Sequence, residues 1–220
     1  MDARFDLLIF DCDGVLVDSE RVANQVFARV LDEVCGLEFS LEEMFDIFVG
    51  HSRAQCLQKI EAMTGTPPPA ELDRRYQQDI NAALADSVQA VAGIETVLDG
   101  LQIPYCVASS GSHEKMRMTL GKSGLQRYFG DNIFSTSEVS RGKPHPDIYL
   151  HAAESMGGFE PARCLVIEDS PIGVEGAAAA GMTVFGFAEM MPARKLLAAG
   201  AHHVFDNMHD LPNLLDSHSS

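Results

Sequence analysis

Two carboxylates stand two residues apart in the segment Asp11-Cys12-Asp13-Gly14, directly after a short apolar run. Carboxylates this close repel each other unless one is protonated or a cation lies between them. Such a pair suits acid–base or metal chemistry at the end of a strand, where Gly14 supplies a permissive backbone. The same segment is also compatible with a simple turn that ends the strand. The pattern alone leaves both interpretations open.

Three later segments place further polar groups after apolar runs. Ser109–Gly111 offers hydroxyls and backbone N–H groups before a predicted helix, which suits either a bound phosphate or an ordinary helix cap. Lys143 precedes a proline-fixed turn, where a solvated lysine is the simpler alternative. Glu168 and Asp169 end another apolar run, and such acids can also serve only to complement a helix dipole. Their order, each after a separate apolar run, favours one shared site.

The apolar runs themselves predict buried strands of a parallel sheet, because each is short and ends in polar residues. They lie at 5–10, 104–109, 132–135, 164–168, 182–187 and 203–205. Helical patterns follow most of them, at 112–123, 146–156, 171–180 and 192–199. This alternation predicts an α/β fold with right-handed crossovers between parallel strands.

One connection is much longer than a crossover requires. Between Asp11 and Ser109 the sequence is helical in pattern, with valines spaced by four residues at Val22, Val26 and Val30. A crossover needs only a dozen or so residues, so this segment exceeds it several-fold. We therefore expect a small helical domain at 16–86, inserted into a core formed by 1–15 and 87–220.

Length and charge limit the classes of function. A chain of 220 residues buries enough surface for a core without disulfides or structural metal. Its 16 basic and 32 acidic residues give a net charge of −16, which argues against nucleic-acid binding through a basic face. The 5 cysteines are widely spaced without a CxxC pair, as is typical of a reducing cytoplasm. No segment has the pattern of a membrane span or signal peptide.

Together, the four segments resemble the motifs of the haloacid dehalogenase superfamily of phosphotransferases with an aspartate nucleophile. The resemblance covers nearly the whole chain, and the helical insertion resembles the branch with a small α-helical cap. That branch contains sugar-phosphate phosphatases and β-phosphoglucomutases. The resemblance implies a Rossmann-like core, an active site between core and cap, and hydrolysis of a small phosphate monoester through an aspartyl-phosphate. We expect a monomer or a weak homodimer.

The resemblance also implies a metal site built from oxygen ligands. Asp11 would be the nucleophile and a metal ligand. Asp13 would protonate the leaving group and then activate water, while its main-chain carbonyl contacts the metal. Asp169 would be the remaining protein ligand, with Glu168 beside it either directly or through water. Oxygen ligands of this kind suit Mg²⁺ rather than zinc.

The phosphate itself would be held by the second and third motifs. By the resemblance, Ser109 and the backbone N–H of Ser110 hold phosphate oxygens, with Gly111 completing the turn. Lys143 would pair with both the phosphate and Asp11. These groups supply the positive charge that an anionic nucleophile needs when it attacks an anionic substrate.

The inserted helices carry one further candidate. The segment Gly50-His51-Ser52-Arg53 resembles a cap turn whose arginine points towards the substrate phosphate in relatives. Arg53 would add positive charge, although an exposed arginine in a first helical turn is the alternative. His51 could contact a sugar hydroxyl or lie on the surface.

Three alternatives to a phosphatase stay open. A β-phosphoglucomutase carries a histidine in the helix after the first motif, where this chain has Ala23, and this favours a phosphatase. Dehalogenases of the superfamily lack the second aspartate, here Asp13. A silent phosphate-binding module would be expected to have lost some of the catalytic residues, and all are present.

The form of two motifs indicates a substrate class. The Asp-Cys-Asp-Gly segment is similar to that of bacterial phosphatases that act on 6-phosphogluconate. The stretch from Lys115 to the Lys143-Pro144 turn shares this similarity. The resemblance implies a phosphorylated sugar or sugar acid as the substrate.

Overall fold

The computed structural model describes residues 5–49, 51 and 53–217 of the chain. These residues form two compact units. The first comprises the chain up to Asp18 and from Gln89 onward, and the second is Ser19–Val88. The sequence interpretation placed the second unit at 16–86. Its action as a cap stays a prediction.

The first unit is built on a six-stranded sheet with the order β3-β2-β1-β4-β5-β6. Its strands are β1 (Leu7–Phe10), β2 (Tyr105–Ser109), β3 (Ile133–Ser135), β4 (Cys164–Glu168), β5 (Thr183–Phe187) and β6 (His203–Phe205). Every pairing is parallel. The expected α/β fold with a parallel sheet is thus confirmed. The strand order reverses at β1, and ligands of such sheets bind at the carboxyl ends beside this point.

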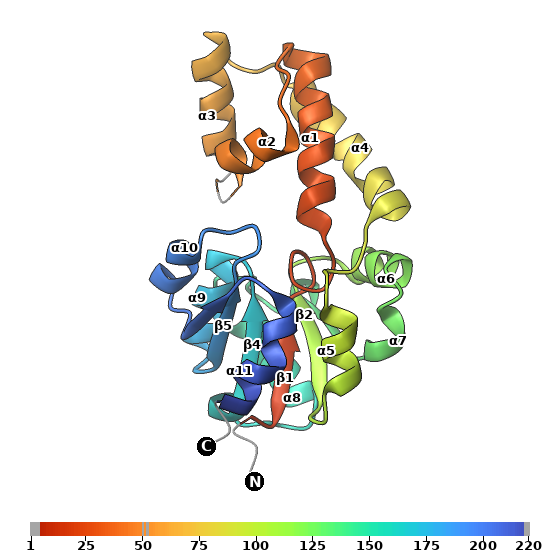
Figure 1. Ribbon diagram of the computed structural model, residues 1–220, viewed down its shortest axis with the longest axis vertical. Coiled ribbons are helices and arrows are strands. Elements are labelled where there is room, and N and C mark those ends of the chain that lie inside the picture. The colour runs from red at the N-terminus through yellow and green to blue at the C-terminus, as the bar shows by residue number, and fades with distance from the viewer. Residues whose placement is uncertain (1–4, 50, 52, 218–220) are drawn as a thin grey trace. The chain divides into compact units, whose positions relative to one another are not determined.

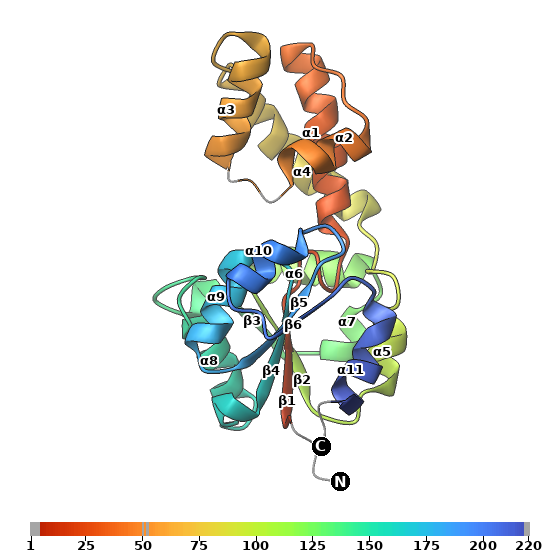
Figure 2. The same cartoon turned by 60° about the vertical axis from the view of Figure 1, so that its left-hand side comes forward.

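Helices cover both faces of this sheet. They are α5 (Ile94–Gly100), α6 (His113–Lys122), α7 (Gln126–Phe129), α8 (Asp147–Ser155), α9 (Pro171–Ala179), α10 (Ala193–Ala198) and α11 (Leu211–Ser217), with 3-10 turns η1 (Thr136–Glu138), η2 (Pro161–Arg163) and η3 (Met208–Asp210). Figure 2 shows α8 and α9 on one face and α5, α7 and α11 on the other. On the first face, Ile9 and Val166 of the strands share a core with Ile148 and Val174 of the helices. The short helices α5, α7 and α11 were not predicted from sequence.

The loops after β2 and β4 also begin helices. Ser112 caps α6 by accepting the N–H of Lys115, and Ser170 caps α9 by accepting the N–H of Gly173. Serine is favoured at this position because its hydroxyl satisfies an N–H that has no partner within the helix. The polar residues after these strands therefore start helices.

The second unit contains four helices, α1 (Ser19–Cys35), α2 (Leu41–Phe48), α3 (Arg53–Thr64) and α4 (Glu71–Ser87). The long helices α1 and α4 lie side by side (Figure 1). Phe27 of α1 makes edge contacts with Phe48 of α2 and Tyr76 of α4, with ring centroids 5.3 and 5.5 Å apart. Aromatic contacts of this kind bury large apolar areas, so they hold the small unit together.

Two properties of the described chain bear on the sequence interpretation. None of the helices in the described segments combines the length and the hydropathy needed to cross a membrane. All five cysteines are free thiols.

Candidate active site

The candidate active site lies where three neighbouring strands end. The register of β1 against β2 and β4 brings Asp11, Ser109 and Glu168 to one edge of the sheet. All three are buried, with exposed fractions of 7, 1 and 0%. Polar groups buried in this way need partners or bound ions, because their desolvation is costly. This edge of the sheet therefore gathers buried polar groups whose partners determine what it can do.

A lysine from the loop between η1 and α8 enters this edge. Lys143 Nζ lies 2.7 Å from Asp11 Oδ1 and 2.5 Å from Glu168 Oε1, and it also donates to the carbonyl of Ala108 at 3.2 Å. Its side chain is only 3% exposed. Lys143 is thus buried, not solvated as in the simpler alternative from sequence, and it contacts residues at the ends of β1, β2 and β4.

Glu168 is held by hydrogen bonds on both of its oxygens. Oε1 accepts from Lys143 and from the hydroxyl of Tyr149, the latter at 2.8 Å. Oε2 accepts the backbone N–H and the hydroxyl of Ser170, at 3.1 and 2.9 Å. A carboxylate has about four acceptor positions, and these four donors fill them. Gly173 packs so closely that a Cβ there would lie 1.9–2.2 Å from the carboxyl group.

The second aspartate of the first motif has a lysine of its own. Lys115 Nζ lies 2.7 Å from Asp13 Oδ2. Lys115 belongs to the first turn of α6, which Ser112 caps. The two aspartates thus have separate cationic partners, Lys143 for Asp11 and Lys115 for Asp13.

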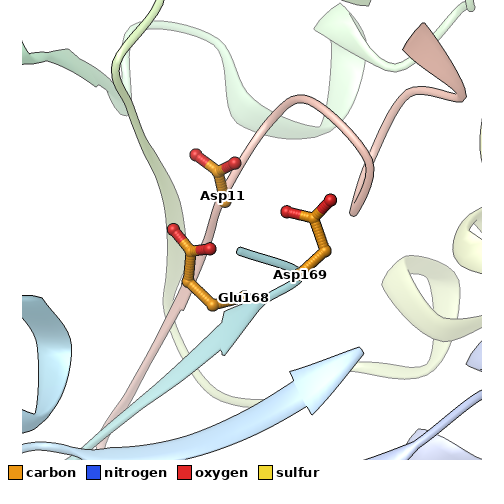
Figure 3. A group of neighbouring side chains, drawn as sticks. All are labelled: Asp11, Glu168 and Asp169. Atoms are coloured by element: carbon orange, nitrogen blue, oxygen red, sulfur yellow. The ribbon is translucent and has the colours of Figure 1, made fainter. Parts of the chain in front are cut away.

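Asp169 completes a group of three acids (Figure 3). One carboxylate oxygen of each of Asp11, Glu168 and Asp169 lies within 4.8 Å of the other two. The backbone at Gly14, within the first motif, lies against Asp169, since a Cβ there would lie 2.0 Å from its Oδ2. Lys143 contacts two of these acids, Asp11 and Glu168, so one ammonium faces two carboxylates. An oxygen-only group with this charge fits a divalent cation such as Mg²⁺.

Burial and charge shift the pKa values of these groups. Burial raises the pKa of Asp11 to about 7, with Lys143 acting in the opposite direction and Glu168 adding to the rise. Burial alone would lower the pKa of Lys143, but the two carboxylates outweigh it and hold that pKa well above its usual value. Burial and Glu168 raise the pKa of Tyr149 well above its usual range. Lys143 and Tyr149 are therefore donors at neutral pH.

The turn after β2 is fixed by hydrogen bonds to the neighbouring loop. Ser109 Oγ accepts the N–H of Gly111 at 3.1 Å, and the carbonyl of Gly111 accepts the hydroxyl of Ser135 at 2.7 Å. The carbonyl of Ser110 accepts from Thr136 Oγ1 at 3.4 Å. Because its carbonyls and the Ser109 oxygen are engaged in this way, the turn presents a defined main-chain shape next to the N-terminus of α6.

Arg53 begins α3 and belongs to the second unit. Its guanidinium forms an ion pair with Asp73, with Nε 2.7 Å from the carboxylate oxygen. The same group lies 4.6 Å from the ring centre of Phe27 and 5.6 Å from that of Tyr76. Arg53 is thus a partly exposed residue in the first turn of α3, and its guanidinium contacts one acid and two aromatic rings. In the preceding turn, Gly50 and Ser52 lie outside the described residues.

Comparison with known proteins identifies the family. The family model of the haloacid dehalogenase-like hydrolases matches residues 5–181, which cover the strand-end motifs described above. This chain belongs to that family. The resemblance inferred from the four motifs is confirmed.

Relatives of this haloacid dehalogenase-like hydrolase match it over nearly its whole length. The 6-phosphogluconate phosphatase of Escherichia coli is 30% identical over 213 residues, which cover 96% of this chain and 95% of the relative. A solved haloacid dehalogenase-like protein of Agrobacterium tumefaciens is 39% identical, with a TM-score of 0.88 over 98% of this chain and all of that one. A hydrolase of the family from Deinococcus radiodurans, solved with bound phosphate and sodium, is 33% identical, with a TM-score of 0.85 over 99% and 97% of the two chains.

Two residues of this hydrolase's site were not predicted from sequence. Tyr149 contacts Glu168 from α8, and nothing in the spacing of two residues 19 apart indicates this contact. Lys115 left a weak signal, because a lysine in the first turn of a helix opposes the helix dipole. Such a residue is retained more readily where a carboxylate compensates it, and here that carboxylate is Asp13.

Proposed function

We propose that the protein is a Mg²⁺-dependent phosphatase that hydrolyses a sugar phosphate or a phosphorylated sugar acid through an aspartyl-phosphate. The observation that carries the proposal is the buried contact of Lys143 with Asp11, at 2.7 Å, beside a group of acids that fits a divalent cation. The similarity to a 6-phosphogluconate phosphatase supports the substrate class.

In the first step, a carboxylate oxygen of Asp11 attacks phosphorus, and the bond between phosphorus and the sugar oxygen breaks. Asp13 gives its proton to that departing oxygen, so the sugar leaves as a neutral alcohol. The ammonium of Lys143 offsets the repulsion between the anionic nucleophile and the anionic phosphate. Covalent catalysis of this kind replaces one difficult displacement by two easier ones.

In the second step, water attacks the phosphorus of the aspartyl-phosphate. Asp13, now a carboxylate, takes a proton from the water, and the bond between phosphorus and Asp11 breaks. Inorganic phosphate leaves, and both aspartates return to their starting states. Asp13 therefore serves as acid and then as base, which requires that its side chain is held at the same place in both steps.

Ser109, Ser110 and Gly111 would hold the phosphate during both steps. Ser109 Oγ already accepts the N–H of Gly111, so its own hydrogen can be donated to a phosphate oxygen. The N–H of Ser110 lies just before the N-terminus of α6, where the helix dipole favours an anion. These donors supply binding without adding a full charge.

The metal would be held by the carboxylates of Asp11 and Asp169 and by the main-chain carbonyl of Asp13. The oxygens of Glu168 already accept four hydrogen bonds, so Glu168 would lie beside the metal and add negative charge rather than ligate it directly. When bound, Mg²⁺ supplies positive charge that neutralises the phosphate and orients it for in-line attack.

The second unit would act as the cap. Arg53 would offer its guanidinium to the anionic substrate in exchange for Asp73, with which it is paired in this structure. Closure of a cap excludes bulk water and so protects the reactive phosphoenzyme. The identity of the sugar would be read by residues of this unit.

Phosphate release from a panel of substrates tests the proposal. The panel contains 6-phosphogluconate, glucose 6-phosphate and p-nitrophenyl phosphate, each assayed with Mg²⁺, with EDTA and with the Asp11→Asn variant. We expect metal-dependent release that the substitution abolishes. Interconversion of glucose phosphates in the presence of a glucose bisphosphate, without release of inorganic phosphate, would favour the β-phosphoglucomutase alternative. Phosphate binding without either activity would favour a silent binding module.

A further inference from the structure

Asp13 is bound asymmetrically. Its Oδ2 lies 2.7 Å from Lys115 Nζ. Its Oδ1 is buried and has no hydrogen-bond partner within the part of the chain that the structure describes. A buried oxygen without a partner is costly. The two oxygens of this carboxyl group are therefore not equivalent, and one is fixed by a cation.

Lys115 occupies an unfavourable place for its own helix. It is the third residue of α6, and a positive charge in the first turn opposes the helix dipole. Its side chain is 34% exposed and bends towards Asp13, 102 residues earlier in the sequence. A lysine that served only solubility would stabilise the helix more near its C-terminus, as the exposed Lys122 does, because the helix dipole favours a cation there.

The position of Lys115 is itself fixed by local structure. The hydroxyl of Ser112 accepts its backbone N–H at 3.2 Å, which sets the start of α6. Its backbone carbonyl accepts the hydroxyl of Thr119 at 3.1 Å. The turn Ser109–Gly111 stands directly before the cap Ser112, so the turn and the lysine belong to one continuous hydrogen-bonded segment.

We propose that Lys115 is a positioning residue for Asp13: it holds Oδ2 and so leaves Oδ1 as the oxygen that exchanges the proton. This inference rests on the proposed phosphatase function. In the first step Oδ1 gives its proton to the departing sugar oxygen, and the resulting carboxylate stays paired with Lys115. In the second step Oδ1 takes a proton from the attacking water. The lysine neither donates nor accepts a proton in either step.

The proposal predicts a dependence on the leaving group. A sugar oxygen leaves as a strongly basic alkoxide unless it is protonated, whereas p-nitrophenolate leaves without a proton. Misplacing Asp13 should therefore slow the first step for the sugar phosphate and not for p-nitrophenyl phosphate. The second step is common to both substrates and should slow for both.

The experiment compares Lys115→Met and Lys115→Arg with Lys122→Met, which removes an exposed lysine from the same helix. With 6-phosphogluconate, or glucose 6-phosphate where the wild type prefers it, we expect kcat of Lys115→Met to fall at least tenfold, as positioned proton transfer contributes about 10²–10⁴ in rate. KM should stay within threefold. Lys115→Arg should recover part of the loss, and Lys122→Met should match the wild type.

Single-turnover release of nitrophenol, with enzyme in excess, separates positioning from general damage. Lys115→Met should release the first nitrophenol within twofold of the wild-type rate. In an Asp13→Asn background, Lys115→Met should cause no further loss of kcat with the sugar phosphate. Three results for Lys115→Met would each overturn the inference. They are a fall in the nitrophenol rate equal to the fall in sugar-phosphate kcat, a loss that adds to that of Asp13→Asn, and a sugar-phosphate kcat within twofold of wild type. A wild-type protein inactive on the whole panel would instead overturn the proposed function.

Discussion

The ammonium of Lys143 lies 2.7 Å from the carboxylate of Asp11, and the two side chains are 3 and 10% exposed. The same ammonium lies 2.5 Å from Glu168, whose side chain is fully buried. One buried cation thus faces two buried carboxylates, and the excess negative charge costs folding free energy in the absence of a bound cation. The site gives up stability for a charge distribution that suits the chemistry.

Removal of this excess charge should stabilise the metal-free protein in a pH-dependent way. Burial raises the pKa of Asp11 from 3.8 to about 7. The folded state therefore binds more protons than the unfolded state between these values, and the cost of Asp11 grows as pH rises through this window. Below it the cost is absent, and above it the cost is constant. Asp11→Asn should be more stable than the wild type at pH 8, and this gain should be much smaller at pH 4.5.

Urea unfolding in EDTA at the two pH values measures this difference. Asp131→Asn serves as the control, because Asp131 is exposed on the same unit, and it should change the stability by less than about 0.5 kcal/mol at both pH values. Equal stability of Asp11→Asn and wild type at pH 8 would contradict the prediction.

Mg²⁺ should stabilise the wild type and fail to stabilise a variant without Asp169. A ligand that binds only the folded state at 100 times its dissociation constant contributes about 2.7 kcal/mol. For a chain of this size that corresponds to a rise in Tm of about 5–10 °C. Asp169→Asn should lose most of this rise in a thermal melt, while Asp131→Asn keeps it. A full shift in Asp169→Asn would remove this residue from the metal site.

Tyr149 should contribute to stability through Glu168. Its hydroxyl donates to Glu168 Oε1 at 2.8 Å, fully buried. Tyr149→Phe leaves one acceptor position of a buried carboxylate unfilled, and should cost about 1.5–3 kcal/mol in the free energy of unfolding. Tyr128→Phe is the matched control, because its hydroxyl bonds Asp99 at the same distance on the surface. If urea unfolding gave the same loss of unfolding free energy for both variants, the burial of Glu168 would add nothing to the contribution of the Tyr149 hydrogen bond.

The sheet could be predicted because its strands are encoded locally. Each strand is a short apolar run that ends in polar residues, and the six observed strands lie within the six predicted ranges. The helices α5, α7 and α11 span only four to seven residues, so their periodic pattern is hard to distinguish from a loop, although the six-residue α10 lies within a predicted helix. They form because the exposed face of the sheet must be covered, which is a tertiary effect.

The candidate residues at strand ends could be placed together by sheet geometry, whereas Lys143 lies in a loop and was assigned by the resemblance. Parallel strands bring their carboxyl ends together, so Asp11, Ser109 and Glu168 could be placed at one edge before the structure was known. Two contacts that were not predicted come from helices: Tyr149 of α8 bonds Glu168, and Lys115 of α6 bonds Asp13. Such contacts depend on the angle of each helix to the sheet, and no local spacing encodes that angle.

Gly173 should be required for the shape of the Glu168 site. A Cβ there would lie 1.9–2.2 Å from three atoms of the Glu168 carboxyl group, whose carboxylate cannot move without losing Lys143. Gly173→Ala should therefore destabilise the protein by about 1–3 kcal/mol and lower phosphatase kcat at least tenfold, despite the better helix propensity of alanine.

Gly121→Ala is the matched control, since it lies in α6 with no atom within 4 Å of its Cβ. That variant should gain about 0.5–1 kcal/mol and keep wild-type kcat. Should urea unfolding and turnover assays give the two alanine variants the same behaviour, the close packing of Gly173 on Glu168 would have no role in holding Lys143 in place.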